Sequence, residues 1–437
     1  MELHILSAIK KYANSRPIKF HMPGHIGDKK FSKIFKGADL DVTELEFIDN
    51  ENAIKRAEDD VKNIMGAKFC RFLTGGATSG ILSMAYAVKD NGNSIIIPRG
   101  AHKSVYNAME LVGINPIIVP DYDGDSDSFI NAVKENLNKD GVIGAFLTYP
   151  DYYGRTFDIL KISNIIKEKS KLLLIDNAHG GHFKFVDTTY AGDVADCWVD
   201  GLHKNFCTLN QGAVVYSNNP DLFDALDEGV SKFSTTSPSY PLLSSIEYGV
   251  KFMGSVGKEK LNKTISCIAK VKEDLLSLGV TILDNNDPLK LWLDFSKLGV
   301  SAIDVEKVFE KAGIFCEMMD GKTLLLMVSV LTPKSWFKNL IGAVKKIKTA
   351  THVLDDNQTP ADILTKKLDY LDAVKSQSEW VELDKSLGRI CAKNAGLFPP
   401  CKPTVVAGEI IDDKAICQLK KKNTFGLKDG RIKVVKE

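Results

Sequence analysis

"KLLLIDNAHGGHF", residues 171–183, is the stretch that decides the fold. Four consecutive apolar residues precede a carboxylate, Asp176, and a glycine-containing turn follows at once. A strand with one face in water alternates apolar and polar residues, whereas a strand covered on both faces is apolar throughout. The run therefore predicts a buried strand of a mostly parallel sheet with helices on both faces, which is typical of an α/β protein.

The sequence on either side of this strand repeats the same alternation. From about residue 54 to residue 215, short apolar runs alternate with segments of helical spacing that end at a glycine or a polar turn. Such alternation predicts βαβ units, whose ligand sites lie beyond the carboxyl ends of the strands. The predicted strands are 69–73, 94–98, 115–120, 141–150, 171–176, 195–201 and 212–217; the predicted helices are 53–67, 81–92, 102–113 and 158–170, with a loop over 74–80.

The flanking sequence predicts additional parts, because 437 residues are too many for one ordinary core. Residues 1–17 predict a short amphipathic helix, and residues 240–279 predict a long helical stretch. A polar linker is expected over 355–362 and a helix over 361–376. The expected divisions are an N-terminal segment (1–50), a large domain (51–255), a small α+β domain (256–355) and a C-terminal domain (356–437).

Composition narrows the function classes. The chain is 44% apolar and 26% charged with a formal net charge of +1, which gives no electrostatic argument for nucleic acid or an anionic membrane. Its longest apolar runs are too short to span a bilayer, and the N-terminal stretch lacks the apolar core of a signal peptide. The eight cysteines form no C-x-x-C pair, which disfavours a zinc ribbon and fits a reducing cytoplasm.

Polar side chains follow several of the predicted strands. The loop "TGGATSG" carries Thr78 and Ser79, and it reads either as an anion site at a helix N-terminus or as a tight turn with a hydroxyl cap. His102 is either an ordinary loop residue or a flat ring that stacks on a ligand. Asp176 is a cap, a metal ligand with His179 and His182, or the partner of a protonated ring nitrogen.

Lys204 lies in "VDGLHKNFCTLNQGA", directly after a histidine and three residues beyond a predicted strand. Taken alone, it reads as a surface lysine. Four successive strand ends, however, would supply a phosphate cradle, a stacking ring, a carboxylate and an amine, which are the parts needed to hold pyridoxal 5'-phosphate. The aldehyde of that cofactor requires a lysine whose amine can be neutral, and partial burial favours a neutral amine.

An ordered set of motifs extends this interpretation over nearly the whole chain. The sequence resembles the fold-type-I pyridoxal-phosphate decarboxylases of ornithine, lysine and arginine, and most of all the short arginine decarboxylases of Gram-positive bacteria. The resemblance implies an aspartate-aminotransferase-like large domain that binds the cofactor. The motifs are "KFHMPGHIGD", "IKRAEDDVKNIMGA", "TSGILSMAYAV", "IIIPRGAHKSVYNAMELVGINP", "YPDYYGRTFDI", "LLIDNAHGGHF", "GLHKNFCTLNQGA", "STTSPSYPLLSSIE", "SLGRICA" and "PPCKPTVVAGE".

The resemblance also implies roles for individual residues. Lys204 would bind the cofactor covalently, and Asp176 would pair with its pyridinium nitrogen. His102 would stack on one face of the ring, with Ala178 on the other. The phosphate would be held by Thr78, Ser79 and His203.

Two further roles extend beyond the cofactor. Ser237, in "STTSPSY", would face the site of a neighbouring subunit, which implies at least a homodimer. Glu409, in "AGE", would approach the distal cationic end of the substrate. The chain departs from the family at Gly201, where a Ser is usual, at Asn177, where a Glu is usual, and at Cys207, Asn210, Cys401 and Ala407.

The function implied is decarboxylation of a basic amino acid, with arginine favoured and lysine or ornithine next. The product would be the corresponding amine, as in polyamine biosynthesis. One alternative is other pyridoxal-phosphate chemistry on the same scaffold, since fold does not fix reaction. An aminotransferase would need an arginine for the substrate carboxylate, for which Arg99 and Arg155 are candidates. Further alternatives are a non-catalytic paralogue and a metal-dependent hydrolase.

Overall fold

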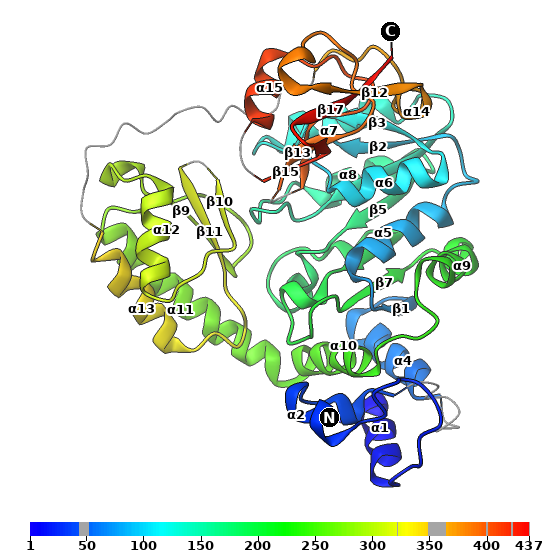
Figure 1. Cartoon of the computed structure of the whole chain (residues 1–437), viewed down its shortest axis with the longest axis vertical. Coiled ribbons are helices and arrows are strands. Elements are labelled where there is room, and N and C mark those ends of the chain that lie inside the picture. Colours follow the sequence, from blue (N-terminus) through cyan, green and yellow to red (C-terminus); the bar gives the residue numbers. More distant parts are fainter. Residues whose placement is uncertain (43–51, 321, 348–363, 399–400, 421–422, 437) are drawn as a thin grey trace. The chain divides into compact units, whose positions relative to one another are not determined.

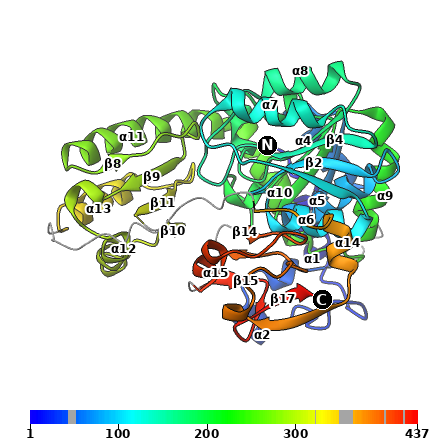
Figure 2. The ribbon, with the colours of Figure 1, turned by 90° about the horizontal axis from the view of Figure 1, so that it is seen from above.

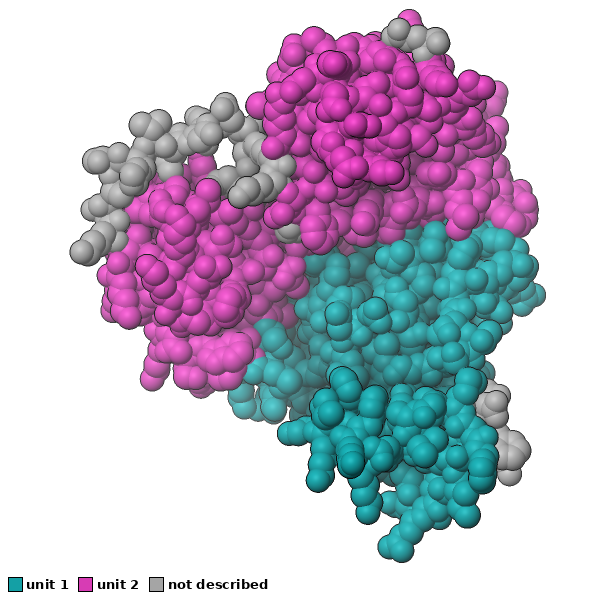
Figure 3. Space-filling model, viewed as in Figure 1, with its two compact units in different colours: residues 1–88, 173–265, 329–331 teal, residues 89–172, 266–328, 332–437 magenta. Residues whose placement is uncertain are grey.

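The computed structural model describes residues 1–42, 52–320, 322–347, 364–398, 401–420 and 423–436. The chain forms two compact units, which Figure 3 distinguishes by colour. Unit 1 comprises residues 1–88, 173–265 and 329–331, and unit 2 comprises residues 89–172, 266–328 and 332–437. The four-part division expected from the sequence stays a prediction, and its linker over 355–362 lies outside the described residues.

Unit 1 contributes four strands to a mixed, mostly parallel sheet (Figure 1). Their order is β1 (Phe69–Leu73), β7 (Ala213–Ser217), β6 (Cys197–Asp200) and β5 (Leu172–Asp176). Strands β5 and β6 are parallel, whereas β7 is antiparallel to both of its neighbours. The sequence correctly predicted that the run before Asp176 is a buried strand.

Helices pack against these strands where the sequence spacing predicts them. Helix α4 (Ala53–Met65) begins at Asn52, whose side chain accepts a hydrogen bond from Lys55 N, and it ends at Gly66 in the left-handed conformation. That conformation is the usual reason for glycine at a helix end. Helix α1 (His4–Asn14) confirms the predicted N-terminal helix. The other helices of unit 1 are α2 (Lys29–Ile34), α5 (Gly76–Ala87), α9 (Phe223–Phe233) and α10 (Tyr240–Phe252).

Unit 2 contributes three parallel strands in the order β4 (Val142–Thr148), β2 (Ser94–Pro98) and β3 (Asn115–Val119). All five residues of β2 are buried, as expected for a strand covered on both faces. The connecting helices are α6 (Lys103–Val112), α7 (Ser126–Asn136) and α8 (Ile159–Glu168). The sequence interpretation missed α7, although its aspartate cap at Asp125 is a recognisable start signal.

A second sheet of unit 2 has four antiparallel strands. Their order is β10 (Met318–Asp320), β11 (Thr323–Met327), β9 (Lys290–Asp294) and β8 (Thr281–Ile282). Figure 2 shows α11 (Lys258–Ser277), α12 (Ala302–Lys311) and α13 (Lys334–Val344) beside this sheet. The α+β content expected within residues 256–355 is therefore present in the part that the structure describes.

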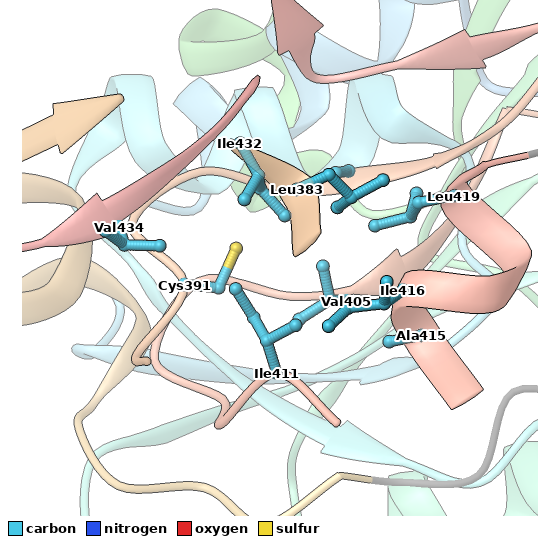
Figure 4. Close-up of a cluster of buried hydrophobic side chains, with 10 residues drawn as sticks. Leu383, Cys391, Val405, Ile411, Ala415, Ile416, Leu419, Ile432 and Val434 are labelled. Carbon is cyan, nitrogen blue, oxygen red and sulfur yellow. The ribbon is translucent and has the colours of Figure 1, made fainter. Parts of the chain in front are cut away.

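The C-terminal part of unit 2 has two small sheets and its own apolar cluster. The strand order of one sheet is β12 (Ser378–Glu382), β17 (Arg431–Val435) and β16 (Leu427–Lys428). The order of the other is β14 (Lys402–Val405), β13 (Ala395–Leu397) and β15 (Thr424–Phe425). Figure 4 shows the buried cluster, which includes Val405, Ile411 and Ile432. The helix predicted over 361–376 is wrong: only α14 (Tyr370–Lys375) is helical among its described residues, and Lys366 instead pairs with Glu409 as a β-bridge.

Short elements complete the description. Helix α15 (Asp413–Leu419) belongs to the C-terminal part. Among the described residues, none of the helices is long and apolar enough to cross a membrane. The single-turn and irregular helical elements are Ala38–Leu40, Gly181–Phe185, Ala191–Asp193, Leu202–Lys204, Pro220–Leu222, Met253–Gly257, Ser296–Leu298 and Leu383–Lys385.

Candidate active site

The site begins at the carboxyl end of β5. Asp176 is the last residue of that strand, and its side chain is buried. Its neighbour Asn177 donates a backbone hydrogen bond to Val199 O of β6 at 3.1 Å, so the two parallel strands end level with one another. Ala178 N donates to Asp176 Oδ1 at 3.2 Å. The chain thus turns sharply around the carboxylate and holds it at the edge of the sheet.

Lys204 lies at the adjacent strand end and is not an ordinary surface lysine. It closes the helical turn Leu202–Lys204 that follows β6, and it is half-buried. Its backbone N donates to Gly201 O at 3.0 Å. Its Nζ lies 2.9 Å from Nε2 of His179, a buried residue of the turn after β5. The amine is therefore held beside the turn that carries Asp176.

Burial sets the electrostatics of Asp176. Removal from water raises the pKa of this carboxyl, while the charge of Lys204 and the hydrogen bond from Ala178 N oppose that shift. A buried carboxylate is stabilised by any cation that reaches it. A protonated ring nitrogen at this position would therefore be held by Asp176 and would stabilise its ionised form in return.

His203 precedes Lys204 and is anchored through both its backbone and its ring. Its N and its Nδ1 lie 3.1 Å and 3.2 Å from Gly212 O. Burial lowers the pKa of His203, and the neighbouring charge of Lys204 lowers it further, against the hydrogen bond to Gly212. With Nδ1 donating to the carbonyl, Nε2 can donate to an anion only when the ring is protonated.

The first turn of α5 lies next to the Lys204 loop. Gly76 N donates to Gln211 O at 3.0 Å, which ties the helix start to that loop. A Cβ on Gly80 would stand 2.6 Å from Val199 Cγ2, so only glycine allows this approach of helix to strand. Backbone N–H groups of the first turn and the helix dipole suit an anion here.

The alternative that Thr78 or Ser79 caps this helix is wrong. The capping position is Gly75, because α5 begins at Gly76 rather than after the predicted loop over 74–80. Thr78 is exposed on the first turn, where its hydroxyl can meet a ligand. Ser79 is buried, and its Oγ donates to Gly76 O at 2.9 Å. Of the two hydroxyls, that of Thr78 is the more accessible.

The close packing around Gly201 explains why a glycine stands where the family usually has a serine. A Cβ at this position would stand 2.8 Å from Ala178 O and 3.4 Å from Ala178 Cβ. The loop before Lys204 therefore packs directly on the residue expected to lie under the cofactor ring. A serine here would displace one of the two segments, so the close approach of their backbones accounts for its absence.

A buried polar network behind the two strand ends was missed by sequence reasoning. Asn177 Nδ2 and Tyr190 Oη both donate to the carboxylate of Asp200, the latter at 2.8 Å, and Trp198 Nε1 donates to Tyr190 Oη at 2.8 Å. Burial raises the pKa of Asp200 to about 7, while the bonds from Asn177 and Tyr190 oppose that shift. The available signal was an acidic residue directly after the apolar strand "CWV".

The metal alternative is not supported. Asn205 Nδ2 donates to His179 O at 2.7 Å and also contacts His182 Nδ1, so an amide lies between the two histidine segments. Within the described ranges, no group of three or more His, Cys, Asp or Glu side chains is arranged to hold a metal ion. His179 and His182 instead take part in hydrogen bonds within unit 1.

The remaining predicted site residues lie on other segments. His102, in unit 2, caps α6: its Nδ1 lies 3.2 Å from Ser104 N and 2.7 Å from Ser104 Oγ, which fixes the orientation of the ring. Ser237 is exposed in unit 1, and its N donates to Thr235 Oγ1 at 3.2 Å. The stacking role of His102 and the intersubunit role of Ser237 stay predictions.

Glu409 is buried in unit 2 against Arg99. Two guanidinium nitrogens of Arg99 contact its two oxygens, one of them at 2.9 Å. Its predicted contact with substrate stays a prediction, and these partners favour another role, argued below. The second arginine considered for an aminotransferase, Arg155, donates from Nε to Asp151 Oδ2 at 2.8 Å. Both arginines are thus engaged by carboxylates of their own unit.

The residues of unit 1 fit pyridoxal phosphate. A buried carboxylate at one strand end suits the ring nitrogen, and a half-buried amine at the next suits the aldehyde. Ala178, two residues after Asp176, is half-buried, as a residue under a flat ring must be. The start of α5 offers backbone N–H groups and the Thr78 hydroxyl for a phosphate. The donor types match the three polar ends of the cofactor.

Known proteins are similar to this chain over most of its length. The model of the Orn/Lys/Arg decarboxylase major domain matches residues 4–293. The arginine decarboxylase of Bacillus subtilis (strain 168) is 27% identical over 468 residues, covering 98% of this chain and 94% of that protein. The inducible lysine decarboxylase of Escherichia coli (strain K12) is 21% identical over 544 residues, covering 94% and 75%.

Solved structures confirm the predicted fold class. The constitutive lysine decarboxylase of E. coli has a TM-score of 0.80 at 18% identity, covering all of this chain and 82% of that one. The serine palmitoyltransferase of Sphingomonas wittichii has a TM-score of 0.56 at 13% identity, covering 79% and 83%. The fold is that of the fold-type-I pyridoxal-phosphate enzymes. With the family model matched over most of its length, the chain belongs to the Orn/Lys/Arg decarboxylase family.

Proposed function

We propose that the protein uses pyridoxal phosphate to decarboxylate a basic amino acid, with arginine the favoured substrate and lysine or ornithine next. One observation carries the proposal: the half-buried amine of Lys204 is held against His179 at the strand end level with buried Asp176. Relatives named as arginine decarboxylases cover nearly the whole chain, which supports arginine as the first choice.

Asp176 keeps the ring nitrogen protonated in this proposal. The bound cofactor supplies an electron sink for the pair released when the Cα–carboxylate bond breaks. Asp176 makes that sink effective because its buried negative charge favours the protonated ring. The hydrogen bond from Ala178 N keeps the carboxylate at the strand end, so little reorganisation is needed during reaction.

Lys204 binds the cofactor aldehyde and afterwards handles a proton. Its Nζ lies 2.9 Å from His179 Nε2, so the ring orients the amine at the sheet edge. Asn205 Nδ2 donates to His179 O and thereby fixes the turn that carries the ring. With cofactor and substrate bound, this amine would hold a proton and return it to the substrate carbon.

The other groups position the cofactor. The first turn of α5, Thr78 and His203 hold the phosphate, with Ser79 behind them as support for the turn. As the family resemblance implies, His102 would stack on one face of the ring and Ala178 would lie on the other. Ser104 holds the His102 ring at a fixed angle, which suits a stacking role.

The reaction is tested by incubating the purified protein with pyridoxal phosphate and arginine, lysine or ornithine in separate assays. The proposal predicts carbon dioxide and the corresponding amine from at least one of them, with arginine turned over fastest. Formation of a keto acid instead would establish the aminotransferase alternative. A bound cofactor with no product from any of the three would contradict the proposed reaction and leave a non-catalytic paralogue or other pyridoxal-phosphate chemistry.

The proposal includes a homodimer or larger homo-oligomer in the cytoplasm. The N-terminal segment exposes a row of apolar side chains, with Ile18 85% and Phe20 97% exposed, and a second copy would remove them from water. Exposed Ser237 would contact the partner's site. Mixing inactive Lys204→Ala and Ser237→Ala chains should then restore part of the activity. If each variant is inactive alone and their subunits exchange, but no activity is restored, shared sites are excluded.

A further inference from the structure

We propose that the Arg99–Glu409 ion pair is a clamp through which the C-terminal part of unit 2 positions the loop carrying His102. Glu409 is then a positioning residue rather than a contact for substrate. The link from this loop to the cofactor rests on the proposed function. The clamp itself rests on contacts within unit 2 alone.

The two side chains pair through both oxygens of the carboxylate and both terminal nitrogens of the guanidinium. Each is 4% exposed, and two nitrogens of Arg99 meet the two oxygens of Glu409. Arg99 Nη2 also donates to Thr404 O at 2.8 Å, and Val406 N donates to Glu409 Oε2 at 2.8 Å. Such a planar, two-bond arrangement between a guanidinium and a carboxylate is stronger and more directional than a single bond.

This pairing leaves Glu409 poorly placed to recognise substrate. A substrate guanidinium would have to displace Arg99, which is tethered to the same unit and already makes two parallel bonds. Displacement would also leave the Arg99 charge buried without its carboxylate, which is strongly unfavourable. The contacts thus favour a permanent partner for Glu409 over a transient one.

The Glu409 side of the clamp is rigid. Cys391 N donates to Glu409 O at 2.8 Å, and Gly408 N donates to Cys391 O at 2.8 Å. Strand β14, which supplies the Thr404 carbonyl, directs Val405 into the apolar cluster of Figure 4. The ion pair is therefore anchored in a core that does not itself include the His102 loop.

The Arg99 side of the clamp leads directly to His102. Arg99 follows β2 and precedes His102 by three residues, and its carbonyl accepts a hydrogen bond from Tyr106 Oη at 2.7 Å. Lys103, the residue after His102, donates its N to Cys401 O at 3.2 Å. The C-terminal segment thus holds the chain on both sides of His102, at Arg99 and at Lys103.

The test compares Glu409→Gln with the double variant Arg99→Gln/Glu409→Gln. The single variant leaves the Arg99 charge buried without its partner, whereas the double variant removes both charges. Glu379→Gln is the matched control, because Glu379 pairs with Arg389 at 2.8 Å in the same C-terminal part. The measurements are hydrogen exchange over residues 99–106, the dissociation constant and visible spectrum of bound pyridoxal phosphate, and the arginine-to-lysine preference.

The clamp predicts faster exchange over 99–106 and weaker cofactor binding with an altered spectrum in Glu409→Gln, by about 2- to 30-fold, the range of typical couplings through positioning residues. The double variant should recover part of both effects, and Glu379→Gln should change neither. The arginine-to-lysine preference should stay the same in all three variants.

Two results would overturn the clamp. One is unchanged exchange and an unchanged cofactor spectrum in Glu409→Gln. The other is a Glu409→Gln variant with a normal spectrum but a shifted arginine-to-lysine preference, where the shift persists in the double variant. That result would establish direct recognition of the substrate by Glu409. Wild-type protein that binds no pyridoxal phosphate would refute the proposed function, but exchange in the cofactor-free chain would still decide the clamp.

Discussion

Asp176 and Glu409 are two carboxylates with the same burial and opposite surroundings. Each is 3% exposed. Asp176 accepts a hydrogen bond from Ala178 N and feels the charge of a half-buried lysine, and its pKa is raised by burial. Glu409 is bound through both oxygens by Arg99 and receives a further bond from Val406 N.

The comparison shows that burial alone does not distinguish a ligand-binding carboxylate from a structural one. A buried charge that lacks a matched partner is costly, and a protein that retains such a charge gains when a cationic ligand supplies the partner. A buried charge with a bidentate partner is already compensated. On this criterion we propose that Asp176 is reserved for a ligand, whereas Glu409 belongs to the framework.

The largest expected effect is on the Asp176 side. Asp176→Asn keeps the shape of the side chain but removes the charge that favours a protonated ring. We expect turnover to fall by about 3–5 orders of magnitude, or roughly 4–7 kcal/mol of barrier, while the cofactor still binds. Steady-state kinetics and the cofactor spectrum of the same preparation measure both. Near-normal turnover would contradict the assignment.

On the Glu409 side, the main expected effect of a substitution is on the stability of the fold. Glu409→Gln breaks a buried ion pair, so the free energy of unfolding should fall by about 3–5 kcal/mol. Glu379→Gln removes a partly exposed pair of the same kind and should cost about 1 kcal/mol or less. Denaturant unfolding of the two variants side by side decides this. Equal losses would remove the distinction between the two pairs.

A third buried carboxylate, Asp200, should make the stability of the folded chain depend on pH. Burial raises its pKa to about 7, so the folded chain binds more protons than the unfolded chain between about pH 4 and pH 7. Stability should therefore fall as pH rises through this window, by up to ~1.4 kcal/mol per pH unit for this group.

Asp200→Asn should remove part of that slope. The remainder should come from Glu58, whose pKa burial likewise raises to about 7, and from Asp176, whose pKa burial also raises. Unfolding by urea at several pH values measures the slope for the wild type and the variant. Parallel curves for the two proteins would show that Asp200 does not titrate in this window.

The smallest expected effect is at Cys401, which departs from the usual glycine beside the clamp. Cys401 has φ +62°, a conformation that costs a non-glycine residue about 1–2 kcal/mol. In Cys401→Gly, relief of this strain offsets the lost burial, so stability should change by less than about 1 kcal/mol. Buried Cys70, within β1, should lose clearly more as Cys70→Gly. Equal losses would contradict the strain argument.

The sequence predicts the Asp176 side of the molecule far better than the Glu409 side. Asp176 directly follows an apolar run, Lys204 comes five residues after the end of another, and parallel strands bring such positions to one edge. The pairing of Arg99 with Glu409 joins residues 310 positions apart, and no local pattern encodes it. The network around Asp200 was missed for the same reason: Tyr190 and Asn177 reach it from different loops.

Local patterns also misled where tertiary contacts decide. The helical spacing over 361–376 gave way to a short helix, because Lys366 pairs with Glu409 and the backbone N of Lys367 and of Leu368 donates to Gly408 O. The start of α5 was placed too late, because its small residues resemble a loop until Gly80 packs on Val199. In both cases a contact distant in sequence overrides local propensity.

The most direct test of the account is the covalent attachment of pyridoxal phosphate. The purified chain is reconstituted with the cofactor, reduced with borohydride, digested and mapped by mass spectrometry. The account predicts one modified residue, Lys204, and loss of the modification in Lys204→Ala while the fold is retained. A modification on another lysine, or a chain that binds no cofactor, would contradict it.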